Sequence, residues 1–397
     1  MIVGGGIVGA VAALALAKTT ALKIAVLDSK ILSLSENQTQ HYDARVSAIS
    51  LASKRIFSNL NVWEKIKSKR ISPYLHMHVW DEAGRGEIHF DAADLNQPAL
   101  GFIIEDSVMR TSLADVCLEY DNLHFFSSVN LISLTQCDDA VELKTSDGDT
   151  FTCKLLIAAD GAHSWVREQM AIPFKTWSYG QTAIVSTVKT TLPHQATAWQ
   201  RFLPTGPLAF LPLSDANTCS IVWSVKHECV DDILSLSETE FCSKLTGAFE
   251  NKLGDVISAT PRFHFPLTMR HVKQYVQPRI ALMGDAAHTI HPLAGQGVNM
   301  GLLDAVCLAE VVSDACSKGR DFSHFAVLRR YERARKSDNL AMLAAVDGLK
   351  TVFISQYKMI QLARNAGLSL ANHSFLRRYF AQYALGNRDN LPRLASQ

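Results

Sequence analysis

A run of glycines near the start of the chain has the spacing of a phosphate-binding turn. Gly4, Gly6 and Gly9 satisfy the pattern G-x-G-x-x-G. Gly4 permits a tight turn, Gly6 lets a phosphate approach the backbone, and Gly9 lets a following helix pack closely. Asp28 lies nineteen residues after Gly9 and could accept hydrogen bonds from ribose hydroxyls. Because an acid there disfavours a 2′-phosphate, the pattern predicts bound FAD or NAD rather than NADP.

A second pair of acid and glycine, Asp160-Gly161, follows the apolar run 155–159. The similar pair Asp147-Gly148 lies between two alternating segments and indicates a plain hairpin turn. Open α/β sheets bind ligands at the carboxyl ends of parallel strands. The position of Asp160 after a buried strand therefore makes this pair a candidate binding turn.

The third motif is Gly284-Asp285-Ala286-Ala287-His288, followed by the run 291–299 (HPLAGQGVN). Asp285 ends an apolar strand, and its carboxylate could hold a ribityl or ribose hydroxyl. A helix that opens near Gly297 could stabilise the negative charge of a reduced flavin. The two histidines at 288 and 291 lack a third ligand at a suitable spacing, so we expect no metal.

These motifs require a parallel sheet with crossover helices. The opening predicts a strand–helix–strand unit, with a helix over 8–18 and a second strand over 23–28. The further elements that the patterns predict are a helix at 105–119, a hairpin at 141–145 and 150–156, a parallel strand at 279–285, and helix from 297 to about 384.

A different texture interrupts this pattern between residues 179 and 225, where alternating β-forming segments predict a mainly antiparallel sheet. The expected fold class is α/β, a Rossmann-like FAD-binding domain with an inserted mainly antiparallel β-sheet substrate domain and a helical C-terminus. The expected segments are 1–168 and 276–345 for the FAD-binding part, 169–275 for the substrate sheet, and 346–397 for the helical tail.

Composition narrows the class of partner. The 397 residues carry a formal net charge of +1, which does not favour a nucleic-acid binder. The eight cysteines show no C-x-x-C pair, and no signal peptide or long apolar run is evident. We therefore expect a cytoplasmic protein. Residues 350–397 hold seven Lys or Arg and one acid. This basic tail could contact the inner membrane peripherally, dock on a partner, or form a solvated helical bundle.

Taken in order, the three motifs resemble the group A flavoprotein monooxygenases, the family of para-hydroxybenzoate hydroxylase. Further segments are similar to the ubiquinone-biosynthesis hydroxylases, most of all to those that act on an octaprenylphenol: RVSAI at 45–49, IIE at 103–105, FLPL at 210–213, IVWS at 221–224 and FPL at 265–267. The resemblance covers nearly the whole chain and is weakest at 30–42 and after residue 350.

The resemblance implies FAD as cofactor, with NADH or NADPH as a transient co-substrate and oxygen transfer through a C4a-hydroperoxyflavin. No side-chain nucleophile is then expected, because the cofactor carries the chemistry. Its pyrophosphate would lie near Gly6 and Arg45, its ribityl chain near Asp285, and Asp160 and Gly161 would form the second fingerprint. The isoalloxazine would meet the residues Pro292, Gly295, Gln296, Gly297 and Asn299. A lipophilic prenylphenol would be covered by the residues Phe210, Pro212, Trp223 and Pro266.

The sequence departs from the family pattern at two places, and two other functions are possible. The first strand has few residues before Gly4, so we expect weak FAD retention, and Asp28 replaces a longer Glu. A hydroxylase of a small soluble aromatic acid would need a cation for the carboxylate, with Arg201 as the candidate. A non-catalytic flavin-fold subunit of a quinone-biosynthesis complex is the second alternative. The apolar cover and the basic tail favour the prenylated substrate.

Overall fold

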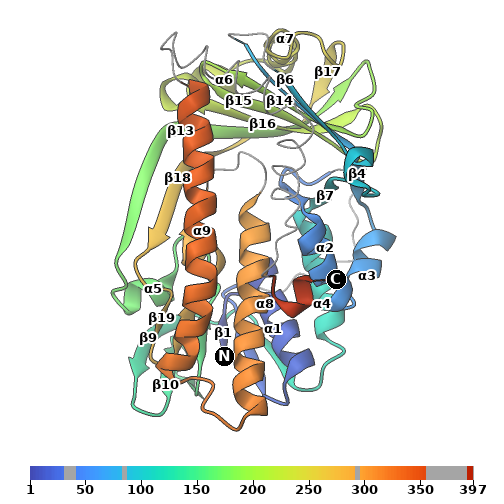
Figure 1. The fold of residues 1–397 in the computed structure, drawn as a ribbon. Coiled ribbons are helices and arrows are strands. Elements are labelled where there is room, and N and C mark those ends of the chain that lie inside the picture. The colour runs from blue at the N-terminus through green and yellow to red at the C-terminus, as the bar shows by residue number, and fades with distance from the viewer. Residues whose placement is uncertain (31–41, 83–86, 291–295, 355–390, 397) are drawn as a thin grey trace.

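The computed structural model describes residues 1–30, 42–82, 87–290, 296–354 and 391–396. A parallel sheet with its helices forms the lower part of the molecule, and a large antiparallel sheet lies above it (Figure 1). The chain passes between the two parts several times. Strands of the large sheet alternate along the sequence with strands of the parallel sheet. The α/β fold class predicted from the sequence is confirmed.

The lower sheet has the order β19-β20-β12-β1-β2-β8, and all its strands are parallel except β19. Its bounds are β1 Ile2–Val3, β2 Ile24–Leu27, β8 Leu123–Phe126, β12 Leu156–Ala158, β19 Val276–Gln277 and β20 Ile280–Leu282. Helix α1 (Ile7–Thr19) is rich in alanine and buried along most of its length. The predicted strand–helix–strand unit is thus confirmed at the centre of the sheet.

Two smaller sheets accompany it. Strands β3 (Val46–Ile49), β7 (Gly101–Glu105) and β4 (Ser72–Tyr74) form one of them. The other contains β9 (Leu131–Gln136), β10 (Val141–Thr145) and β11 (Thr150–Cys153), so the predicted hairpin is confirmed. The helices around them are α2 Leu51–Asn59, α3 Trp63–Ser68, α4 Asp106–Cys117 and α5 Trp165–Gln169, of which α4 confirms the helix predicted at 105–119.

The upper sheet follows the order β21-β18-β13-β16-β15-β14-β5-β6, with β17 beside β13. Its bounds are β5 His76–Asp81, β6 Glu87–Asp91, β13 Phe174–Thr190, β14 Thr197–Leu203, β15 Gly206–Pro212, β16 Thr218–Lys226, β17 Val256–Ala259, β18 Phe263–Val272 and β21 His288–Thr289. Only the β14–β5 pair is parallel, which confirms a mainly antiparallel sheet. Strands β5 and β6 join it from within the first expected segment, and the exact domain boundaries remain a prediction.

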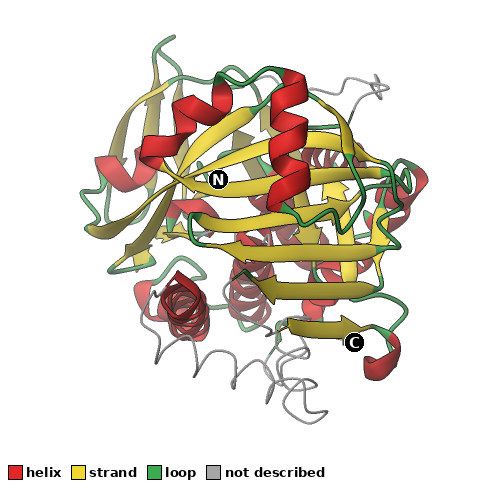
Figure 2. Ribbon diagram, turned by 90° about the horizontal axis from the view of Figure 1, so that it is seen from above, coloured by secondary structure: helices red, strands yellow, loops and turns green. Residues whose placement is uncertain are grey.

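The outer face of the upper sheet is covered by α6 (Val230–Leu234) and α7 (Glu238–Ala248) (Figure 2). Helix α7 begins at a capping box, in which Ser237 and Glu240 satisfy each other's backbone amides. Its apolar side meets the sheet through a buried cluster that includes Phe241 and Leu245. One face of the sheet is therefore filled by core packing, and only the opposite face turns toward the lower part.

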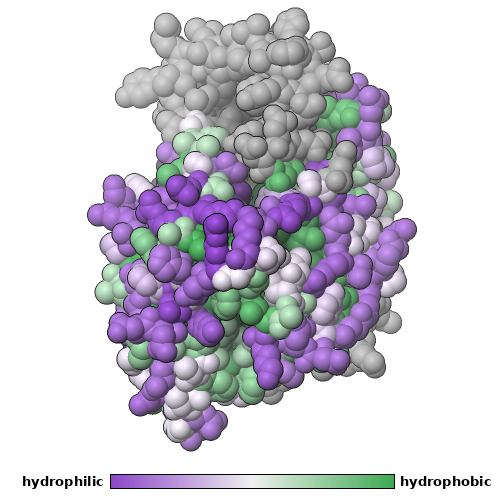
Figure 3. Space-filling model, turned by 60° about the horizontal axis from the view of Figure 1, so that its bottom comes forward, coloured by the Kyte–Doolittle hydropathy of each residue, from purple (hydrophilic) through white to green (hydrophobic). Residues whose placement is uncertain are grey.

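Helices α8 (Gln296–Ser317) and α9 (Phe325–Ile354) run side by side from the lower part toward the upper sheet (Figure 1). They confirm the predicted helical region up to residue 354, and the rest of that prediction lies outside the described residues. The short 3₁₀ turns are Ala93–Leu95, His227–Cys229, Gly284–Ala286 and Arg393–Ala395. Within the described ranges, no helix is both long and apolar enough to cross a membrane. On the face in Figure 3, hydrophobic areas are small and interspersed with hydrophilic side chains.

Candidate functional site

The glycine turn after β1 has the geometry that its spacing predicts. Gly4 has a φ of +100°, and a Cβ there would lie 2.4 Å from the Ala159 carbonyl oxygen. A Cβ on Gly9 would lie 1.9 Å from the Gly4 carbonyl oxygen, so helix α1 can start this close to the strand only with glycine. Gly6 differs, because its nearest neighbour would be an Arg110 guanidinium nitrogen at 3.9 Å. The turn is therefore tight on its inner side and open at Gly6, where a phosphate could approach.

Asp28 follows β2 and lies against this turn. One carboxylate oxygen accepts a hydrogen bond from the Gly5 amide at 2.6 Å, and the other accepts one from the Lys30 amide at 2.8 Å. The structure thus brings the predicted ribose-binding acid to the glycine turn. Its contact with a ribose remains a prediction.

Asp160 and Gly161 follow β12, the strand beside β1. Asp160 Oδ2 accepts a hydrogen bond from the Val166 amide at 3.1 Å, whereas Asp160 Oδ1 is buried without a partner in the described structure. Burial raises the pKa of Asp160, and its hydrogen bonds oppose this rise. Gly161 has a φ of +83°, and a Cβ added there would have no neighbour within 4 Å. A buried acceptor without a donor is costly, so this oxygen fits a ligand hydroxyl or amide.

The third motif forms the turn Gly284–Ala286, which the fold places beside the first. Gly284 has a φ of +57°, and a Cβ there would lie 3.3 Å from Val8 of helix α1. Gly301 of α8 meets Val8 even more closely, at 2.6 Å from its Cβ position. Burial raises the pKa of Asp285, and the charges of His288, Arg45 and Arg270 offset this in part. The turn therefore places a half-buried acid at the junction of α1, α8 and the parallel sheet.

Two arginines supply positive charge between the first and third motifs. Burial raises the pKa values of both Asp285 and Asp106, and the charge of the exposed Arg45 offsets part of each rise. Arg110, on α4, reaches the open side of Gly6. The sequence reasoning missed Arg110, because a single arginine inside an amphipathic helix has no distinguishing local signal. Its proximity to Gly6 is a consequence of α4 packing beside α1.

The start of α8 is fixed by Asn299, which was predicted to meet the isoalloxazine. Its Oδ1 accepts a hydrogen bond from the Ser50 amide at 3.0 Å, and its Nδ2 donates to the Ala48 carbonyl at 2.8 Å. The side chain thus ties α8 to the junction of β3 and α2. Gln296 and Gly297 lie in the first turn of α8, and Pro292 and Gly295 lie outside the described residues.

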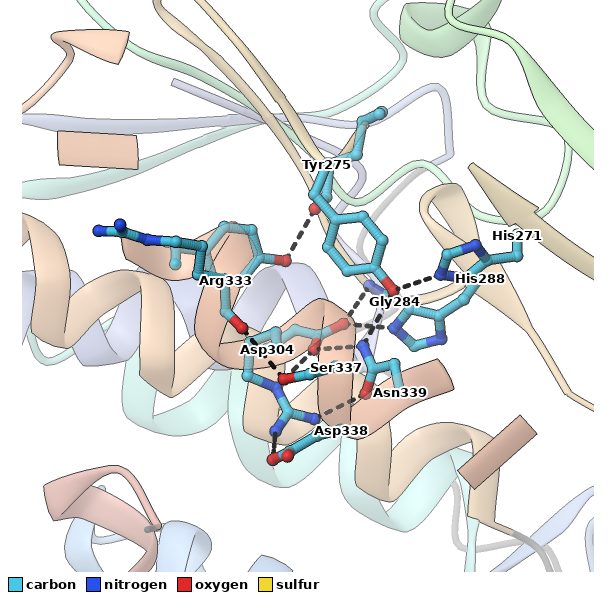
Figure 4. A network of polar contacts seen from close by, with 12 residues as sticks. His271, Tyr275, Gly284, His288, Asp304, Arg333, Ser337, Asp338 and Asn339 are labelled. Atoms are coloured by element: carbon cyan, nitrogen blue, oxygen red, sulfur yellow. Dashed lines mark hydrogen bonds and ion pairs between the residues drawn. The ribbon is translucent and has the colours of Figure 1, made fainter. Parts of the chain in front are cut away.

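A buried polar network lies behind the Gly284 turn and was not predicted from the sequence (Figure 4). Its centre is Asp304 of α8, which pairs with His288 at 2.5 Å and with Arg335 of α9 at 2.8 Å. The sequence predicts no metal at His288. Among the described residues, no group of three His, Cys, Asp or Glu side chains is arranged to hold a metal ion. A charged residue at a buried position of an apolar helix is the only sequence signal that marks Asp304.

All four predicted substrate residues lie on the face of the upper sheet that points away from the lower part of the molecule, and their contact with a substrate stays a prediction. Phe210 and Trp223 pack in the cluster beneath α7, and Phe210 stacks on Phe249 at 3.9 Å between centroids. Pro212 pairs with Cys219 of the same cluster. Pro266 is exposed and lies opposite Thr182, whose own partner Val225 belongs to that cluster too. Directly opposed residues share one face of a sheet, so these side chains point away from the lower part.

The opposite face carries the neighbours of these residues, since alternate residues of a strand point to opposite sides. Leu211 packs with Ala48 and Ile103 of the small sheet, next to the Ala48 carbonyl that Asn299 holds. Val222 shares this face with Leu211, and so does Phe265, which is 41% exposed. The face of the upper sheet that turns toward the lower part is therefore apolar at these positions, which are the sequence neighbours of the predicted residues.

Comparison with known proteins agrees with this geometry. The family model "FAD binding domain" matches residues 1–342. The chain is 36% identical to the 3-demethoxyubiquinol 3-hydroxylase of Escherichia coli, over 97% of both chains. It is 35% identical to the ubiquinone hydroxylase UbiL of Rhodospirillum rubrum, over 97% of this chain and 89% of the relative. For the human ubiquinone biosynthesis monooxygenase COQ6 the identity is 34%, over 93% of this chain and 88% of the relative.

Solved structures agree on the fold. The p-nitrophenol 4-monooxygenase PnpA of Pseudomonas putida superposes with a TM-score of 0.79 at 19% identity, covering 98% of both chains. Klebsiella pneumoniae HpxO, solved with FAD and uric acid, has a TM-score of 0.74 at 19% identity over 96% of both chains. The fold and the site define the class of FAD-dependent aromatic-ring monooxygenases. The chain belongs to the FAD-binding-domain family of these enzymes, among the relatives of the ubiquinone-biosynthesis hydroxylases, and its cofactor is FAD.

Proposed function

We propose that this enzyme hydroxylates the phenol ring of a polyprenylated ubiquinone precursor, using NADH or NADPH and O2. The observation that carries the proposal is the similarity to ubiquinone-biosynthesis hydroxylases over nearly the whole chain. The apolar face formed around Leu211, Val222 and Phe265 is consistent with a lipophilic substrate.

Arg201 argues against the alternative of a small aromatic acid. A substrate carboxylate needs an accessible cation. Arg201 is 5% exposed, donates to the Ala248 carbonyl and forms an ion pair with Glu250 at 2.8 Å. It also lies opposite Leu208 of the cluster beneath α7, so it is on the face of the sheet that points away from the cofactor. This guanidinium is already used for packing the sheet, and the prenylated substrate is the better proposal.

The residues of the site fit FAD in an extended conformation. In this proposal the adenosine ribose binds at Asp28, and the pyrophosphate binds over Gly4, Gly6 and Gly9 with Arg45 and Arg110 supplying positive charge. The open space at Gly6 and the unpartnered oxygen of Asp160 support this placement. Gly284 and Asp285 would hold the ribityl chain, and the first turn of α8, from Gln296 and Gly297 to Asn299, would face the flavin ring.

Bound FAD supplies hydride acceptance from NAD(P)H and activation of O2 for transfer to the aromatic ring. The protein's own contribution is orientation and exclusion of water. The Asp285 carboxylate can anchor a hydroxyl, and the amides at the start of α8 can stabilise negative charge on the flavin ring. The apolar side chains of Leu211 and Val222 would keep water from the face where the phenol binds.

Complementation provides the test. The gene for this chain is expressed in bacterial strains that are each blocked at one ubiquinone hydroxylation step, and the quinones are identified by mass spectrometry. Restoration of ubiquinone in one strain is expected and identifies the ring position. In parallel, NAD(P)H oxidation by the purified enzyme should be stimulated by prenylphenols. Stimulation by hydroxybenzoates but not by prenylphenols would reverse the proposal in favour of the small soluble acid.

Assembly and membrane contact form a second, separate part of the proposal. The pathway of the relatives suggests a ubiquinone-biosynthesis complex as partner, and the seven basic residues in 350–397 suggest peripheral contact with an anionic membrane. Most of this tail lies outside the described residues. Flotation of the full chain with phosphatidylglycerol vesicles, compared with phosphatidylcholine vesicles, tests the membrane contact directly.

A further inference from the structure

The carboxylate of Asp304 is fully buried between the cofactor turn and helix α9. Its Oδ2 accepts hydrogen bonds from the Gly284 amide at 3.2 Å and from His288 Nε2 at 2.5 Å. Its Oδ1 accepts from Arg335 Nε at 2.8 Å and from Asn339 Nδ2 at 3.1 Å. These donors reach the Asp304 side chain of α8 from two other segments of the chain, residues 284–288 and helix α9 (Figure 4). One oxygen thus holds the turn, and the other holds α9.

The charge of Asp304 determines which atoms carry hydrogen. Burial by itself would raise the pKa of Asp304, but His288 and Arg335 outweigh it and lower the pKa to about 2. The carboxylate is therefore ionised at neutral pH and can only accept hydrogen bonds. His288 must then carry its hydrogen on Nε2, which fixes the orientation of the imidazole.

Arg335 gives the arrangement its rigidity. It is 4% exposed and also contacts Asp338 at 3.1 Å and Asn339 at 2.8 Å. Asn339 in turn donates to the Tyr275 hydroxyl at 3.2 Å, and the Tyr275 ring stacks on His288 with 5.9 Å between centroids. If Asp304 served only to join α8 to α9, its ion pair with Arg335 would be sufficient. The bonds to Gly284 and His288 need another explanation.

We propose that Asp304 is a positioning residue for the flavin half of the cofactor. It accepts hydrogen bonds from the Gly284 amide and the His288 ring, which lie on either side of Asp285 in sequence. These bonds determine the position of the Asp285 carboxylate. The inference rests on the proposed placement of FAD over this turn. It predicts a local effect: the adenosine half binds at Gly4 and Asp28, and its affinity should not depend on Asp304.

The test compares two ligands on the apoprotein. FAD and ADP share the adenosine and pyrophosphate, and only FAD reaches the Gly284 turn. The first variant is His288→Phe, which removes the donor to Asp304, keeps a ring beside Tyr275, and leaves the Arg335 pair intact. By isothermal titration we expect its Kd for FAD to rise at least about tenfold, with the Kd for ADP within about twofold of wild type. Asp304→Asn is the second variant and should show the same separation of the two ligands.

A control on α9 separates positioning from general loss of stability. Glu332 is 4% exposed and accepts a hydrogen bond from the Tyr275 amide at 2.9 Å, without touching the turn. Glu332→Ala should lower the melting temperature and leave both Kd values unchanged. The reduction potential of the bound flavin, measured by dye equilibration, should shift in His288→Phe and not in Glu332→Ala.

Asp285→Ala distinguishes failure of this inference from failure of the proposed cofactor placement. If Asp285→Ala weakens FAD but not ADP while His288→Phe weakens neither, Asp304 has no positioning role. If Asp285→Ala weakens FAD and ADP equally, the cofactor does not lie over the turn as proposed. Equal weakening of FAD and ADP in both His288→Phe and Asp304→Asn would also overturn the inference, because it would mean a general structural defect.

Discussion

Exchange of side chains on the two faces of strand β15 should separate stability from substrate binding. Phe210 and Leu211 are consecutive, yet Phe210 is buried beneath α7 and Leu211 lies on the opposite face, which turns toward the lower part and, in our proposal, toward the cofactor. We therefore expect Phe210→Leu to destabilise the fold with little effect on substrate affinity. Leu211→Asn should weaken the binding of a prenylated substrate and leave most of the stability intact.

The magnitudes follow from the contacts. Phe210 is fully buried and stacks on Phe249 with an interplanar angle of 26°. Loss of this aromatic pair and some packing costs about 2 kcal/mol, which lowers the melting temperature by a few degrees. Leu211 is only partly buried, so its replacement removes apolar contact with a bound prenyl chain. At about 0.8 kcal/mol per methylene group, the loss of two or three contacts reduces kcat/KM by about tenfold or more.

The assay is steady-state NAD(P)H oxidation coupled to product analysis, with a prenylphenol and with the same phenol lacking the prenyl chain. Leu211→Asn should affect only the prenylated substrate, and thermal unfolding followed by circular dichroism gives the stability of both variants. A raised KM in Phe210→Leu together with an unchanged KM in Leu211→Asn would refute the assignment of the two faces.

Four further predictions address the cofactor site and the tail. Gly6→Ala should fold normally yet bind FAD at least about tenfold more weakly. Gly9→Ala should unfold more readily, because its Cβ would lie 1.9 Å from the Gly4 carbonyl oxygen. Thermal unfolding and FAD titration of both variants check these outcomes. The pKa of Asp304 is about 2 in the folded protein against an ordinary 3.8, so its ionised form should add about 2 kcal/mol to the free energy of unfolding above pH 3.8. This contribution is lost as the pH falls through 2. The difference in stability between wild type and Asp304→Asn, measured by urea unfolding, should therefore narrow at low pH. Because burial raises the pKa of Asp285, its ionised form opposes folding at neutral pH; Asp285→Asn should raise the apoprotein melting temperature at pH 7 but not below pH 3.8, while weakening FAD binding. Charge reversal of Arg377 and Arg378 to Glu should reduce flotation with anionic vesicles, and unchanged flotation would contradict a role of these charges.

Local patterns in the sequence were sufficient for the motifs and most elements. Gly4 and Gly9 could be recognised because the requirement for glycine is a property of the backbone turn itself, which involves neighbours in the chain. The helices and the hairpin at 141–153 were predictable for the same reason, since periodicity and turn residues act over a few positions. The acids at 28, 160 and 285 each follow a parallel strand, and parallel strands end at one edge of a sheet, so their convergence could also be inferred.

Only the tertiary structure decided which face of the upper sheet turns toward the lower part of the molecule. Phe210 and Leu211 are both apolar, so this strand lacks the alternation of apolar and polar residues that would identify its buried face. A shift of one residue exchanges the two faces. Arg110 and Arg201 illustrate the same limit. Each is an arginine in an ordinary local context, and packing brought Arg110 to Gly6 while it committed Arg201 to Glu250.

The Asp304 network shows the division most clearly. By itself the sequence determined a dinucleotide turn, an acid after each of several strands, and a long glycine-containing motif that opens a helix. It could not determine that Asp304 holds Gly284 and His288, or that Arg335, thirty-one residues further on, neutralises it. Burial makes these distant partners necessary, because a carboxylate removed from water must find its donors wherever the fold brings them.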